Sequence, residues 1–215
     1  MEGERRMKVS LERVAPMEIE ARSFEIIERE LPHPIDPVLA PIVKRVIHTT
    51  ADFDYADTLC FSEGVVDKAL AAIRPGAVIV TDTTMAMSGI NKKALAKHGG
   101  EARCFIADAD VAERAARNGT TRAVASMDKA AGIDRPLIFA IGNAPTALVR
   151  IYELIREGRL DPRLVIGVPV GFVNVVQSKE LIMTADVPYI VARGRKGGSN
   201  VAAAICNALL YMLGR

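Results

Sequence analysis

His48 is the residue best suited to chemistry, because an imidazole side chain can exchange a proton near neutral pH. It lies in RVIHTTADFDYAD (45–57), one of five polar or glycine-rich segments that stand where strands of an α/β sheet should end. The other four are TDTTMAMSGI (81–90), GNAPTAL (142–148), GVPVGFV (167–173) and GRKGGSN (194–200). Parallel sheets bind ligands at the carboxyl ends of their strands. The pattern therefore predicts one broad polar pocket with a single obvious proton carrier.

His48 itself has two interpretations. It ends an apolar helical stripe, so it could be a core or capping histidine. Its neighbours favour chemistry, because Thr49 adds a hydroxyl group and three carboxylates follow, those of Asp52, Asp54 and Asp57. A carboxylate beside the ring could orient it for general acid–base catalysis.

Other polar side chains stand at the starts of predicted helices. Thr83 and Thr84 come directly after a strand and fit either an ordinary turn with a helix cap or a polar pocket. Asn143 has the same two interpretations. Arg122 could pair with an anion, whereas Lys179 is more typical of a solvated cap. The GRKGGSN segment opens a helix whose N–H groups could hold a carboxylate or a phosphate.

The elements that must position these residues follow a β–α alternation. Apolar runs predict five strands, at Ala77–Thr81, Ala102–Ala107, Leu137–Ile141, Leu164–Val168 and Tyr189–Ala192. Helices are predicted at 17–31, from Pro37 to near His48, at 62–74, from Asn91 to Gly99, and at 110–117, 121–131, 145–158, 179–185 and 199–213. We therefore expect an α/β fold, a three-layer doubly wound sheet of about five strands, mainly parallel. Residues 1–16 are predicted to be a flexible N-terminal extension and residues 17–215 a single domain.

Composition excludes several classes of protein. The net charge is +2, from 28 basic and 26 acidic residues, with no basic stripe to indicate nucleic-acid binding. Cys60, Cys104 and Cys206 are isolated, as is typical of a reduced cytoplasmic protein. No apolar run is long enough to span a membrane, and the N-terminus lacks the apolar core of a signal peptide. Motifs for zinc (HExxH), for a serine hydrolase (GxSxG) and for nucleotide phosphates are also missing.

The five segments, in this order, resemble the precorrin-8X methylmutase family. The likeness extends from about Ile19 to Met212 and includes ARSFEII near the start. The sequences RVIHTTADFD and TDTTMA are most similar to those of the branch that acts on cobalt-precorrin-8. Two departures stand out: Asn174 and Gln177 occur in GFVNVVQSKE where many relatives read GFVGAAESKE, and Glu20 replaces a tyrosine of some metal-free-route relatives.

The resemblance implies an isomerase of cobalamin biosynthesis. The family moves a methyl group from C-11 to C-12 of a corrin precursor and gives cobyrinic or hydrogenobyrinic acid. His48 would be the catalytic acid, and the implied substrate-binding residues are Arg22, Ser23, Thr49, Thr83, Thr84, Arg122, Asn143 and Lys179. A homodimer is implied, with a tetrapyrrole as substrate and product, no cofactor and no metal site, since any cobalt is carried by the substrate. A corrinoid-binding carrier without catalysis is the alternative.

Overall fold

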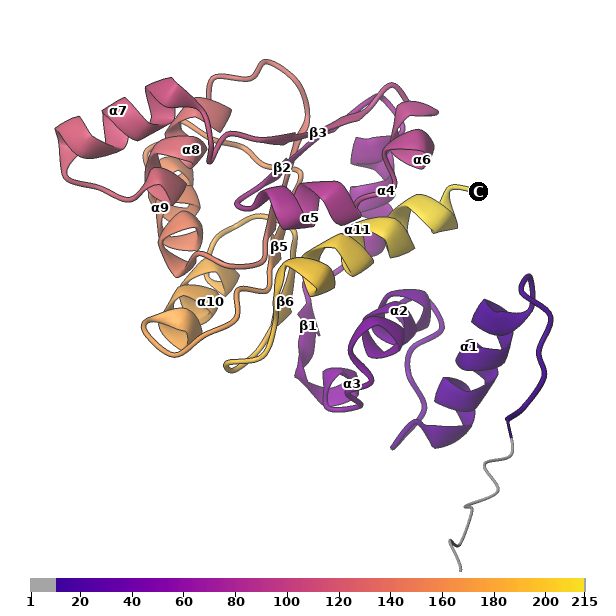
Figure 1. Cartoon of the computed structure of the whole chain (residues 1–215). Coiled ribbons are helices and arrows are strands. Elements are labelled where there is room, and N and C mark those ends of the chain that lie inside the picture. The colour runs from indigo at the N-terminus through magenta and orange to yellow at the C-terminus, as the bar shows by residue number, and fades with distance from the viewer. Residues whose placement is uncertain (1–10, 215) are drawn as a thin grey trace, which may run out of the picture.

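The centre of the molecule is a six-stranded sheet with helices on both faces (Figure 1). The computed structural model describes residues 11–214. The strands are β1 (Leu59–Phe61), β2 (Val78–Thr81), β3 (Glu101–Cys104), β4 (Leu137–Ile141), β5 (Leu164–Gly167) and β6 (Tyr189–Ala192). The helices are α1 (Ile19–Glu30), α2 (Ala40–Thr50), α3 (Tyr55–Thr58), α4 (Val65–Ile73), α5 (Thr84–Gly89), α6 (Lys92–Ala96), α7 (Ala109–Asn118), α8 (Arg122–Ala130), α9 (Pro145–Arg156), α10 (Val175–Met183) and α11 (Ser199–Met212).

The strand order is β1-β6-β5-β4-β2-β3, and every pair is parallel except β1 with β6. The predicted three-layer, mainly parallel sheet is confirmed. The sixth strand, β1, is an addition: it has only three residues, and it pairs antiparallel with β6, Leu59 opposite Ala192. A run this short carries no periodicity that could identify it as a strand.

Alternating side chains divide the core between the two faces of the sheet. Ile79, Ile138 and Ile166 pack with α2, α4, α5, α6 and α11, whereas Val80 and Phe139 pack with α8, α9 and α10. Such alternation follows from the two-residue period of a strand. Nearly continuous burial of β2, β4 and β5 explains why these strands contain only apolar residues and Thr81 or Gly167.

The two N-terminal helices extend the core on the α11 side of the sheet, to which α2 contributes four buried residues and α1 contributes Ile27. α2 packs mainly on α11, and α1 packs on α2, so α1 lies at the periphery of the molecule (Figure 1). The sequence predicts that the second helix begins at Pro37, but α2 begins at Ala40 with Leu39 as its N-cap. Residues 37–39 form a turn instead, in which the Asp36 carboxylate accepts a hydrogen bond from the Val38 N–H at 2.8 Å. The predicted extension over 1–16 falls mostly outside the described residues, and residues 11–15 form neither helix nor strand.

Candidate active site

The order of the strands creates a switch point between β2 and β4. From β2 the chain passes to β3 on one side, and it then returns past β2 to β4 and continues outward through β5 and β6. Open α/β sheets bind ligands in the crevice at such a point, beyond the carboxyl ends of the strands. Thr83 and Thr84 follow β2 and Asn143 follows β4, so the structure places these three predicted residues at the switch point.

Asp82 holds the two sides of the switch point together. Its carboxylate, 2% exposed, accepts hydrogen bonds from the N–H groups of Gly142 (2.9 Å), Asn143 (2.8 Å) and Ala144 (2.6 Å). Burial raises the pKa of Asp82, and the three N–H donors act in the opposite direction. The loop after β4 is therefore fixed by a residue of β2, and the Asn143 side chain is left exposed at the edge of the sheet.

The loop before α11 packs closely against the loop after β4 at the switch point. A Cβ atom at Gly142 would lie 2.7 Å from Ser199 Cα and 2.8 Å from the Gly198 carbonyl oxygen, so the two loops approach more closely than a side chain allows. The Thr83 hydroxyl lies 2.7 Å from that of Ser199 and also accepts from the Ala86 N–H at 3.1 Å, capping α5. Thr83 thus has the capping role, while Thr84 is exposed.

His48 lies in the last turn of α2 and is exposed together with Thr49. Its ring packs against Phe24 of α1, with the centroids 5.3 Å apart and the planes inclined at 46°. Ala51 ends the helix in the left-handed conformation, with φ of 53°. The imidazole is therefore held by an aromatic contact and a firm helix end, and its polar edge is available to a ligand.

The carboxylates after His48 have other partners. Asp52 and Asp54 both accept hydrogen bonds from Lys196, and Asp57 contacts the His33 ring at 2.8 Å. The expectation that one of them orients His48 is wrong for the described part of the chain. Lys196 lies 144 residues beyond Asp52, and the sequence holds no local signal for that pairing.

Arg22 and Ser23 lie on α1, next to Phe24. The Arg22 guanidinium binds Glu12 at 2.9 Å and Glu25 at 3.3 Å, and the Ser23 hydroxyl donates to the Ile19 carbonyl at 2.8 Å. α1 is fastened to α2 by Arg45, which lies against the rings of Phe24 and Tyr211 and pairs with Glu20 at 3.0 Å. Glu20, one of the departures from metal-free-route relatives, therefore has a structural partner. Through Phe24, α1 lies beside His48.

Lys179 is fully buried beneath the loop before α11. Its amine donates to the carbonyl oxygens of Gly194 (2.9 Å) and Lys196 (2.8 Å), and burial lowers its pKa to about 8. The interpretation as a solvated cap is wrong, because the amine faces inward. In this geometry Lys179 supports a loop of the site and does not itself point to solvent.

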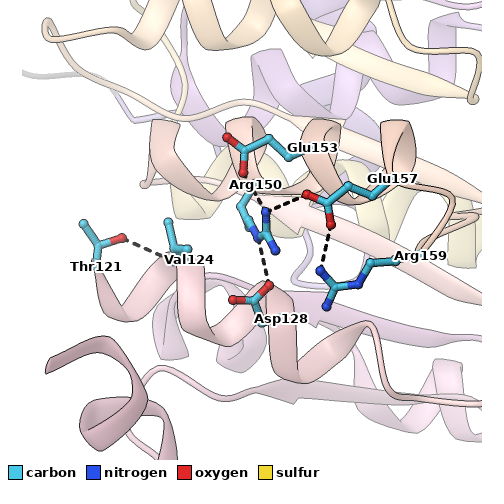
Figure 2. A network of polar contacts seen from close by, with 7 residues as sticks. All are labelled: Thr121, Val124, Asp128, Arg150, Glu153, Glu157 and Arg159. Atoms are coloured by element: carbon cyan, nitrogen blue, oxygen red, sulfur yellow. Dashed lines mark hydrogen bonds and ion pairs between the residues drawn. The ribbon is translucent and has the colours of Figure 1, made fainter. Parts of the chain in front are cut away.

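Arg122 is exposed at the first position of α8, on the other side of the switch point. The Thr121 hydroxyl caps this helix at the Val124 N–H (3.2 Å) and lies 3.2 Å from the hydroxyl of Thr146, the second residue of α9. Figure 2 shows how Arg150 of α9 joins the two helices: it binds Asp128 and Glu153, each at 2.8 Å. The remaining contacts of this network join Glu157 to Arg150 and to Arg159.

A hollow of about 350 Å³ lies beside this network, between the start of α9 and the loop before α10. Thr146, Val173 and Asn174 contribute to its wall. Asn174 has φ of 57°, the left-handed conformation that glycine adopts freely and asparagine tolerates better than most residues. The replacement of a glycine by Asn174 is therefore compatible with this loop.

Two further observations concern the kind of site. Among residues 11–214, no group of three or more His, Cys, Asp or Glu side chains is arranged to hold a metal ion. Within the same range, no helix is long and apolar enough to cross a membrane.

Fold and site together define a doubly wound α/β protein with polar side chains gathered at its switch point. Residues 18–212 match the family model for precorrin-8X methylmutase, and the chain belongs to this family. It is 48% identical over 197 residues to the cobalt-precorrin-8 methylmutase of Priestia megaterium (91% of this chain, 88% of the relative). It is 37% identical over 173 residues to the precorrin-8X methylmutase of Pseudomonas aeruginosa (80% and 83%).

A solved structure extends the likeness to three dimensions. The precorrin-8X methylmutase of Thermus thermophilus superposes with a TM-score of 0.83 at 41% identity, covering 91% of this chain and 96% of that one. The chain is accordingly a methylmutase, an isomerase of cobalamin biosynthesis.

Proposed function

We propose that this chain converts cobalt-precorrin-8 to cobyrinic acid by moving the methyl group on C-11 to C-12. Two relatives that are 48% identical to this chain are both named for the cobalt substrate, which supports the cobalt branch. The product is an isomer of the substrate, so the reaction needs no redox cofactor. The cobalt belongs to the substrate.

His48 is the general acid in this proposal. Its proton goes to an atom of the conjugated ring, which draws electron density toward that atom and lets the methyl group migrate with its bonding electrons. Return of the proton to His48 completes the isomerisation. The support for this role is geometric: an exposed imidazole, held against Phe24, four residues before Asp52, whose partner Lys196 lies in the loop after β6. General acid catalysis of this kind contributes about 10²- to 10⁴-fold to the rate.

The carboxylates of the substrate are the proposed partners of the remaining polar residues. Arg122 is exposed at the start of α8 and can supply a bidentate contact to a carboxylate. Thr84 and Asn143 are exposed at the switch point, and Thr49 lies next to His48. Arg22 and Ser23 approach from α1, whereas Thr83 and Lys179 act indirectly, by shaping the loops.

We also propose a homodimer. Four large apolar side chains are exposed near the carboxyl ends of β2 and β5: Met85 (70%), Val170 (48%), Phe172 (80%) and Val173 (79%). Apolar groups gathered at one edge of a sheet are typical of a surface that is covered in the assembly. Light scattering tests this directly, and a fully active monomer would refute it. A cytoplasmic location is our prediction for the assembled protein.

The decisive experiment is an absorbance titration with cobalt-precorrin-8. The unaltered protein should give the cobyrinic acid spectrum, while His48→Ala should bind and convert about 10²- to 10⁴-fold more slowly. His98→Ala is the matched control, because His98 precedes β3 at the opposite edge of the sheet from His48. Binding without conversion by the unaltered protein would identify a corrinoid carrier instead.

A further inference from the structure

Lys196 bridges two carboxylates at the edge of the candidate site. Its amine lies 2.6 Å from Asp52 and 2.5 Å from Asp54. All three side chains are in contact with solvent, at 46%, 29% and 67% exposure. The two carboxylates raise the pKa of Lys196, and Lys196 lowers the pKa of Asp52, which favours the charged forms of these two groups.

The bridge joins two segments that are each fixed independently. Asp52 follows the helix end at Ala51, and its N–H donates to the Thr50 hydroxyl at 3.3 Å. On the other side, Lys179 holds the carbonyl oxygen of Lys196 at 2.8 Å from below. The Lys196 backbone is therefore anchored by a buried residue, and the side chain reaches from this fixed base to the segment that follows His48.

The charges of this cluster matter because the proposed substrate is a polyanion. Two carboxylates and one ammonium leave a net charge of −1 only four residues beyond His48, and removal of the ammonium would leave −2. Charges exposed at the edge of a site change the affinity for an anionic ligand at distances up to about 8–10 Å, the screening length at physiological salt.

We infer that Lys196 determines specificity by masking Asp52 and Asp54, so that a ligand with several carboxylates can approach His48. This inference rests on the proposed function. Lys196 does not contact the ligand in this account, because both carboxylates already engage its amine.

The test compares Lys196→Met with the triple variant that adds Asp52→Asn and Asp54→Asn. Lys196→Met should raise both KM and the dissociation constant of the substrate about fivefold at low salt, the effect of one uncompensated charge on several carboxylates at about 8–10 Å. The value of kcat should stay within about twofold. At about 0.5 M salt the difference should shrink, because the charges are screened. The triple variant, whose cluster carries no net charge, should lose this penalty and have a KM at or below that of the unaltered protein, by up to about fivefold at low salt.

The matched control is Lys129→Met. Lys129 also bridges two carboxylates, Asp108 and Asp110, each at 2.7 Å, but its helix α8 packs on the opposite face of the sheet from α2. Its substitution should leave KM unchanged. A triple variant as weak as Lys196→Met would overturn the inference, since Lys196 would then bind the ligand or hold the loop itself. Absence of turnover in the unaltered protein would instead refute the proposed function.

Discussion

Asp82→Asn tests the role of the buried carboxylate at the switch point. The amide oxygen can replace one carboxylate oxygen, but the NH₂ group then faces at least one of the three N–H donors of Gly142, Asn143 and Ala144. The substitution therefore removes a charge-assisted hydrogen bond and leaves a buried N–H without an acceptor. Each of these effects costs about 1–3 kcal/mol, so we expect a loss of about 2–4 kcal/mol in the free energy of unfolding.

Thermal unfolding followed by circular dichroism measures this loss. For a chain of 215 residues, 1 kcal/mol shifts the Tm by about 2–4 °C, so Asp82→Asn should melt about 5–15 °C below the unaltered protein. Asp67→Asn is the control, because Asp67 is exposed in the first turn of α4, and it should change the free energy of unfolding by less than about 0.5 kcal/mol. A Tm for Asp82→Asn within about 2 °C of the unaltered protein would refute the reasoning.

Three further predictions concern the same framework. Gly142→Ala should lower the free energy of unfolding by about 1–3 kcal/mol, because its Cβ would lie 2.7 Å from Ser199 Cα at the start of α11. The control Gly132→Ala should be nearly neutral in urea unfolding, because its Cβ would lie 3.5 Å from the nearest atom. Arg150→Ala should lower the free energy of unfolding by about 3 kcal/mol, because the Asp128 carboxylate, only 17% exposed, loses its cation. Arg159 is an exposed neighbour, and equal melting curves for Arg150→Ala and Arg159→Ala would contradict this. Burial lowers the pKa of Lys179 to about 8 in the folded protein, below its value in the unfolded chain, so above pH 8 the unfolded state binds more protons. The free energy of unfolding should therefore rise from pH 8 to 10 relative to that of Lys179→Met. Equal pH profiles of the two proteins would refute this prediction.

Most strands could be predicted, because a strand that is buried on both faces is a continuous run of apolar residues. β4 and β6 have the predicted bounds, and β2 and β5 differ by one residue at one end. β3 is shorter than predicted: it lies at the edge of the sheet and is only partly buried, so the apolar residues after Cys104 belong to a turn. α5 was not predicted as an element, since six residues are too few to show a helical period.

Four of the five polar segments follow strands as predicted, and they meet because the carboxyl ends of parallel strands lie at one edge of the sheet. The expectation that the segment over 45–57 also follows a strand is wrong, since it begins in the last turns of the helix α2. The partners of individual side chains could not be predicted. Asp82 stood in the TDTT segment, but only the structure shows that three N–H groups converge on it. Lys179 and Lys196 have opposite environments, one buried and one exposed, although the sequence predicts both to lie near a helix start. Lys179 in fact lies in the middle of α10, which begins four residues earlier than predicted. Such differences depend on contacts between segments far apart in the chain.

The pairing of β1 with β6 has a consequence for how the chain is made. β1 is synthesised about 130 residues before β6, the strand with which it pairs, and α2 is likewise made long before α11, the helix on which it mainly packs. Contacts of such long sequence separation form late, because the loop between them must first be closed. The helix that carries His48 should therefore dock only after α11 has been made, so a nascent chain assembles β2 to β5 before it positions the proposed acid.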